Sequence, residues 1–185
     1  MLDNDNQIKA LLDRAKLEAD KLYKETYAAA RRDEEQITET AVSSMIILVL
    51  TRSALDHIAT GLQAKLGIKN DFSPYFPISK TASAFQKKLD KDFPGLETKY
   101  PAFVDYIRSI QPFNKNLGSE AIEELNTLCN TAKHQRLLDI SAFRERLSEE
   151  ENPIQYHRLG RKRLNDVIRM SIEMATMVWL KSNPL

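Results

Sequence analysis

The stretch AVSSMIILVLTRSALDHIATGLQAKL, residues 41–66, decides the fold class of this chain. Its apolar side chains recur at steps of three and four, which places them on one face of an α-helix. The stripe consists of Ala41, Met45, Leu48, Arg52, Leu55, Ala59, Leu62 and Leu66. Gly67 follows directly and is expected to end the helix. The one charged member of the stripe, Arg52, must find a partner wherever this face is buried.

Helical spacing also dominates the rest of the chain. Before residue 36 it predicts an amphipathic helix, with a turn at the charged cluster of residues 31–35. One unbroken helix of about 60 residues, roughly 90 Å long, is the alternative. After Gly67 the pattern predicts an aromatic-rich loop at 68–78, a short helix at 81–93, a helix from Pro101 to a break at Gln111, a helix capped by Ser119 that fades near residue 138, and a last helix at 159–181.

The fold class that follows is all-α. Residues 138–143 (LDISAF) are the one stretch that could form a strand instead. We expect a single domain over residues 1–185, consisting of a helical bundle at 36–185 and a long N-terminal helix or helical hairpin at 1–35 that could protrude from it.

The overall charge excludes a general attraction to polyanions, because 27 basic residues nearly cancel 26 acidic ones. RNA binding would therefore need a local basic patch, and the best candidates for it are His157, Arg158, Arg161, Lys162, Arg163 and Arg169. A solvated helix face is the alternative interpretation, since residues 149–151 just before this cluster are acidic.

The cellular compartment is suggested by cysteine use and by hydropathy. The single cysteine, Cys129, rules out an intramolecular disulfide, and the longest apolar run, residues 45–50, is short for a membrane span. The N-terminus lacks the basic-then-apolar pattern of a secretory signal. We expect a cytoplasmic protein with no membrane partner.

Because the stripe places Arg52 inside, we expect it to be largely buried and ion-paired with Asp56, and its role allows two interpretations. Asp56 lies one helical turn after it and could hold it in a purely structural ion pair. Alternatively, Arg52 could act on a substrate together with His57, five positions further on. Five residues of helix separate two positions by about 140° around the axis, so Arg52 and His57 do not share a face.

A second polar group stands at NTAKH, residues 130–134. Asn130 and His134 are one turn apart and share a face, with Lys133 beside them. Histidine can exchange protons near neutral pH, lysine can neutralise a phosphate, and asparagine can orient either. The alternative is a solvated helix end, where basic side chains favour the helix dipole.

Several motifs with established chemistry are absent from the sequence. It contains no Gly-rich phosphate loop, no Gly-x-Ser-x-Gly, no His-Glu-x-x-His and no Glu-x-x-His. With three histidines and one cysteine in all, we expect neither a transition-metal site nor another cofactor.

The order of the segments RSALDHI, YFPI, SIQPF and NTAKHQRLL, over about residues 48–138, resembles a set of uncharacterised bacterial proteins. Those proteins share an R-S-A-L-D-H helix, an F-P-I loop, a Q-P-Y/F turn and an N-x-x-K-H element. This resemblance implies no activity.

Arg52 and His57 also fit the Arg-x4-6-His motif, so the chain resembles HEPN (higher eukaryotes and prokaryotes nucleotide-binding) domains. Ser53 departs from that family, which usually has Asn, Asp or His there. The resemblance implies a metal-independent ribonuclease or RNA-binding component of an antiviral defence or toxin-antitoxin system, acting as a dimer. His57 would then be the general acid or base, and Arg52 would stabilise charge on the phosphate, with His134 and Lys133 as further candidates.

A non-catalytic interaction module is the competing hypothesis. In it, Arg52 and Asp56 form a buried structural pair, and the N-terminal helix binds a partner protein or a second copy of the chain. An Arg52 bonded within its own core would favour this hypothesis, whereas an Arg52 and a His57 that converge on a polar cleft would favour the ribonuclease.

Overall fold

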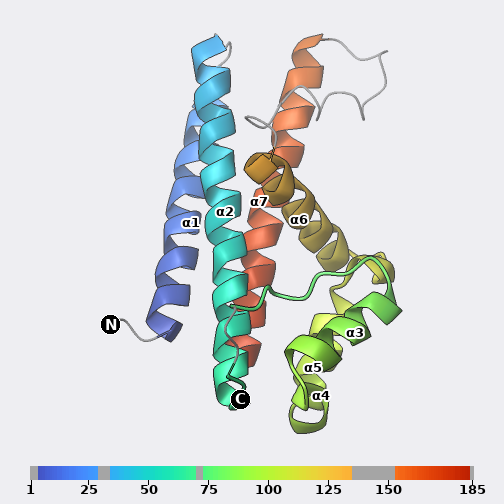
Figure 1. Cartoon of the computed structure of the whole chain (residues 1–185). Coiled ribbons are helices and arrows are strands. Elements are labelled where there is room, and N and C mark those ends of the chain that lie inside the picture. Colours follow the sequence, from blue (N-terminus) through green and yellow to red (C-terminus); the bar gives the residue numbers. More distant parts are fainter. Residues whose placement is uncertain (1–3, 29–33, 70–72, 135–152, 184–185) are drawn as a thin grey trace.

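A computed structural model describes residues 4–28, 34–69, 73–134 and 153–183 (Figure 1). Within these ranges, residues 25–28, 34–38, 117, 131–134 and 153–163 are described by their backbone alone. The described part of the chain is helical and contains no β-strand, which confirms the predicted all-α fold. Its elements are α1 Asn4–Ala28, α2 Glu34–Lys65, α3 Ala82–Asp92, α4 Leu96–Lys99, α5 Pro101–Ser109, the 3-10 turn η1 Pro112–Asn114, α6 Leu117–His134 and α7 Pro153–Ser182.

Three long helices, α1, α2 and α7, lie side by side, and α2 is antiparallel to α1 (Figure 1). Helix α6 packs against both α2 and α7, while the short helices α3, α4 and α5 form a group beside the lower half of the bundle (Figure 1). An extended segment, residues 73–79, crosses from the α2 side to this group. The longest helix, α2, contacts α1, α6 and α7, and α7 contacts α5 in addition to α1, α2 and α6.

The core is built around the buried face of α2. Five aliphatic side chains on this face are at most 2% exposed: Ile47, Leu48, Leu55, Ile58 and Leu62. Helix α1 contributes Ile8, Leu12, Ala15 and Leu22, and α7 contributes Leu164, Ile168, Ile172, Ala175 and Val178. The burial of these side chains from water is the main source of stability of such a bundle.

The N-terminal region is thus two helices that pack together, and the alternative of one 60-residue helix was wrong. Helix α1 does not protrude, because its apolar stripe is buried against α2 and α7. The charged cluster predicted as the turn lies mostly outside the described residues.

Most helix ends follow the local signals in the sequence. Gly67 ends α2 in a left-handed conformation with φ of 71°, and Pro101 opens α5. The Ser119 cap was wrong, because α6 begins two residues earlier, at Leu117. Asn116 caps the helix instead. Its side-chain oxygen accepts from the backbone amide of Ser119 at 2.9 Å, and its backbone amide donates to the Ser119 hydroxyl at 2.7 Å.

Two further differences concern the C-terminal third. Helix α7 begins at Pro153, well before the predicted start at residue 159. The candidate strand at 138–143 lies outside the described residues.

One stretch of the described helices, Glu39–Lys65, is long and apolar enough to cross a membrane. Length and composition alone do not distinguish a membrane span from the central helix of a bundle. Half of the most apolar window of this stretch is buried inside the fold.

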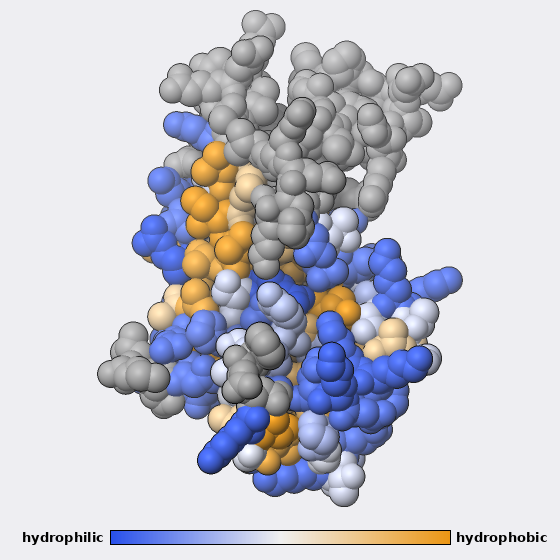
Figure 2. Space-filling view, in the orientation of Figure 1, coloured by the Kyte–Doolittle hydropathy of each residue, from blue (hydrophilic) through white to orange (hydrophobic). Residues whose placement is uncertain are grey.

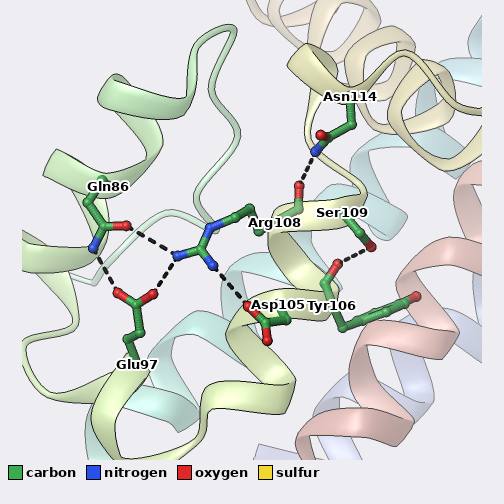
Figure 3. Close-up of polar contacts among 7 residues, drawn as sticks. All are labelled: Gln86, Glu97, Asp105, Tyr106, Arg108, Ser109 and Asn114. Carbon is green, nitrogen blue, oxygen red and sulfur yellow. Dashed lines mark hydrogen bonds and ion pairs between the residues drawn. The ribbon is translucent and has the colours of Figure 1, made fainter.

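Arg108 connects the three short helices (Figure 3). Its guanidinium donates to Glu97 at 2.6 Å, to Asp105 at 2.9 Å and to Gln86 at 3.3 Å. Gln86 in turn donates to Glu97 at 2.9 Å. The hydrogen bond from Arg108, reinforced by the one from Gln86, holds the pKa of the Glu97 carboxyl below its usual value.

This lowered pKa predicts a pH-dependent contribution to stability. A carboxyl whose pKa is lower in the folded state stabilises the fold above its unfolded pKa, and this contribution disappears as the pH falls through the folded pKa. Glu97→Gln should therefore lower the melting temperature at neutral pH by at most a few degrees, because the network is exposed, and by nothing in acid. Melting curves of the parent and of Glu97→Gln, recorded from neutral pH down into acid, test this prediction. Glu173→Gln, at an exposed carboxylate 3.8 Å from Arg169, is the control, and an equal pH dependence in both variants would contradict the prediction.

Candidate functional site

Arg52 is 8% exposed and points from α2 toward the extended segment and α6. Its Nη2 lies 3.2 Å from Asp56 Oδ1 and donates to the backbone carbonyl oxygen of Phe76 at 3.3 Å. Its Nη1 donates to Asn126 Oδ1 at 3.5 Å. The predicted burial of Arg52 and its pairing with Asp56 are confirmed.

Asp56 has a second partner besides Arg52. The backbone amide of Phe76 donates to Asp56 Oδ1 at 2.8 Å. The amide and the carbonyl of one residue in the extended segment are thus both bonded to the ion pair on α2. We call this arrangement of Arg52, Asp56 and the Phe76 backbone the Phe76 clamp. It satisfies two backbone groups that no helix or sheet supplies with partners, and it holds the fully buried Phe76 ring in the core.

Gln111 plays a similar part further along the same segment. It is fully buried, its Oε1 accepts from the Ser79 amide at 2.9 Å, and its Nε2 donates to the carbonyl of Pro77 at 3.0 Å. Nε2 also donates to the carbonyl of Ile107 at 3.0 Å, which ties the segment to α5. In the sequence, Gln111 indicated only a helix break before a proline, and no local pattern predicted its contacts with the extended segment.

Lys88 on α3 extends the charged cluster around the clamp. Partial burial lowers its pKa, and the positive charge of Arg52 lowers it further, while Asp92 and Asp56 oppose the shift. Gln63 of α2 donates to the backbone carbonyl of Asp92 at 2.7 Å, which fixes the end of α3 against α2. Lys88 was not among the predicted site residues, because nothing in its local sequence indicates proximity to Arg52.

His57 is half-buried on α2, and its backbone carbonyl accepts from Asn4 Nδ2 at 3.2 Å. Within the described part of the chain, no hydrogen bond joins its ring to Arg52 or to any other group. The Arg52 guanidinium is bonded toward the extended segment and α6, while the backbone of His57 is bonded to Asn4 at the start of α1. The structure therefore does not bring Arg52 and His57 into one bonded pair.

The other candidate residues belong to the last turns of α6 and the first turns of α7. Asn130 is exposed on α6, whereas the side chains of Lys133 and His134 lie outside those that the structure describes. The same holds for the side chains of the predicted RNA-binding residues of α7, which are Arg158, Arg161, Lys162 and Arg163. Their roles stay predictions.

Within the described ranges, no group of three or more histidine, cysteine, aspartate or glutamate side chains is arranged to hold a metal ion. Comparison with family models, with curated proteins and with solved structures found no match to this chain.

The clamp predicts a specific loss of stability. Arg52→Ala should lower the free energy of unfolding by about 3 kcal/mol, since it leaves Asp56 and the buried Phe76 carbonyl without their cationic partner. Arg52→Lys should lower the free energy of unfolding by less than Arg52→Ala, because an ammonium keeps the positive charge. It should still be less stable than the parent, because a lysine cannot reach Asp56, Phe76 and Asn126 together. Urea unfolding curves give these values.

Arg169→Ala is the matched control, because Arg169 forms an exposed pair with Glu173 at 3.8 Å. It should cost less than about 1 kcal/mol. Equal unfolding midpoints for the parent and Arg52→Ala would contradict the structural role of the clamp.

Proposed function

We propose that this chain is a non-catalytic helical binding module, in which the Arg52–Asp56 pair shapes the fold and a face of the bundle binds another protein chain. The observation that carries the proposal is the engagement of both terminal nitrogens of Arg52 inside the fold, by Asp56, Phe76 and Asn126. An arginine that stabilises charge on a phosphate must direct free N–H groups into a site open to that phosphate.

Recruiting Arg52 to a substrate would also disturb the fold. The guanidinium would have to leave the carbonyl of Phe76, whose amide is bonded to the same carboxylate that Arg52 pairs with. The cost of stranding these buried groups is of the same order as the stability of many domains, about 3–5 kcal/mol against 5–15 kcal/mol. Catalysis by Arg52 would thus compete directly with folding.

A HEPN-like, metal-independent ribonuclease is the second candidate. The half-buried His57 favours it, because this ring has no hydrogen bond within the described residues and imidazole is a common general acid or base in catalysis. Such an enzyme would have to use His57 without Arg52 in its present position.

An RNA-cleavage assay separates the two candidates. The parent, His57→Ala and a matched surface variant, Thr60→Ala, are incubated with several labelled single-stranded RNAs in EDTA, and the product ends are identified by mass spectrometry. The binding module predicts no cleavage by any of the three proteins. Cleavage by the parent and by Thr60→Ala, lost in a folded His57→Ala and yielding 2′,3′-cyclic phosphate ends, would overturn the proposal in favour of the ribonuclease.

A further inference from the structure

Helix α2 keeps one face open to solvent in its N-terminal half. Val42, Ile46 and Val49 are 40%, 48% and 38% exposed, although the opposite side of the same turns is fully buried. Their spacing of four and three residues puts them on one line along the helix. Figure 2 shows the resulting apolar patch on the upper part of α2. We call these three residues the α2 stripe.

Tyr75 adds an aromatic side chain near the lower end of this face. It is 63% exposed, although its neighbours Pro74 and Phe76 are buried. The Phe76 amide is bonded to Asp56, two helical turns after Val49, so the peptide between Tyr75 and Phe76 lies against α2. An exposed aromatic on a fixed backbone is typical of side chains that contribute strongly to protein interfaces.

The charge pattern distinguishes the α2 stripe from other exposed apolar positions. Residues 40–51 (TAVSSMIILVLT) contain no charged side chain. Leu17 on α1 is more exposed, at 60%, but its neighbours one turn away are all charged: Asp13, Arg14, Asp20 and Lys21. In a symmetric dimer, each residue near the two-fold axis faces the same residue of the other copy. A charged residue there would face a like charge, so an uncharged face suits contact with an identical face.

The residues at the two ends of the face are complementary in an antiparallel arrangement. Glu39 and His57 are eighteen positions apart, which is five full helical turns, so they point in the same direction about 27 Å apart along α2. A two-fold axis at the level of Leu48, midway between them, would place Glu39 of one copy opposite His57 of the other. An imidazole N–H can donate to a carboxylate.

From these observations we infer that the α2 stripe binds the same stripe of a second copy of this chain, antiparallel about a two-fold axis near Leu48. This inference rests on the proposed function and names the partner. Ile46 and Val49 of both copies meet at the centre, Val42 of each covers the region of Ser53 of the other, and Tyr75 lies at the rim.

Sedimentation equilibrium of the full chain tests the surface. The parent is expected to form a dimer whose population rises with concentration, and Ile46→Glu to raise the dissociation constant at least about tenfold, since two glutamates would face each other at the centre. Leu17→Glu, at an exposed leucine of α1, is the matched control and should dimerise like the parent. Circular dichroism melting confirms that both variants remain folded.

Cysteine substitutions test the orientation. In the antiparallel dimer, the cysteines of Val49→Cys in the two copies are offset along the helix axis by only about two residues. They should therefore form an intermolecular disulfide on mild oxidation. Val42→Cys would lie about 18 Å along the axis from its copy and should not. Cys129 is buried and can stay in both variants. Efficient cross-linking at both positions would indicate a parallel contact and overturn the antiparallel one.

Charge exchange tests the predicted end contacts. His57→Glu should weaken the dimer, because it opposes Glu39 of the other copy, and the double variant Glu39→Lys, His57→Glu should restore the affinity. Equal weakening in the single and double variants would remove this pairing.

The failures of the two proposals can be told apart. A parent that stays monomeric at its highest soluble concentration, or an Ile46→Glu variant that dimerises like the parent, overturns the dimer and leaves the binding module intact. A monomeric parent that binds phosphatidylcholine vesicles would assign the stripe to lipid. Cleavage of RNA that depends on His57 overturns the binding module whatever the oligomeric state.

Discussion

The architecture depends on how one buried guanidinium is satisfied. Arg52 lies on the buried face of α2, where an unpaired charge would strongly destabilise the fold. Asp56 alone leaves some N–H groups of the guanidinium without a hydrogen-bond partner. The remaining donors bind the carbonyl of Phe76 and the side chain of Asn126, which come from the extended segment and from α6. Burial of the long helix is therefore complete only when both of these elements have docked. Gln111 couples the same segment to α5, so the group of short helices is attached to the bundle through polar contacts as well as apolar ones.

This dependence limits what Arg52 can do for function. A guanidinium can hold a backbone carbonyl or a substrate phosphate with the same N–H groups, but not both at once. The geometry around Arg52 serves the first task. Residues 40–51, directly before Arg52 on the same helix, contain no charged side chain, whereas a nuclease would be expected to have a basic surface near its phosphate-binding arginine. Structural use of the charge and an uncharged neighbouring face are consistent with binding to another protein chain.

The sequence predicted the contacts within single helices and missed those between distant segments. The step of three and four residues located α2 and put Arg52 inside, and the i to i+4 spacing identified Asp56 as its partner. Phe76 and Asn126, which are 24 and 74 residues from Arg52, could not be identified, because no local pattern encodes a contact across the fold. Asn116 and Ser119 both suit a helix start, and only the geometry of the turn shows that Asn116 is the cap. The burial of α1 was equally undetermined, since an amphipathic stripe fits a neighbouring helix of its own chain or a partner equally well.

The Phe76 clamp bonds to the main chain and makes no use of the side-chain identity at position 76. Pro74 and Pro77 lack amide hydrogens and restrict the backbone on either side, so they lower the entropic cost of the extended path without competing for the carboxylate of Asp56. What the clamp constrains is thus the course of the polypeptide through this region. A distant relative could keep that course with different residues throughout the segment, provided that an arginine and an aspartate remain one turn apart on its longest helix. The similarity of such proteins would be visible in the trajectory of the backbone long after it had been lost from an alignment of residues.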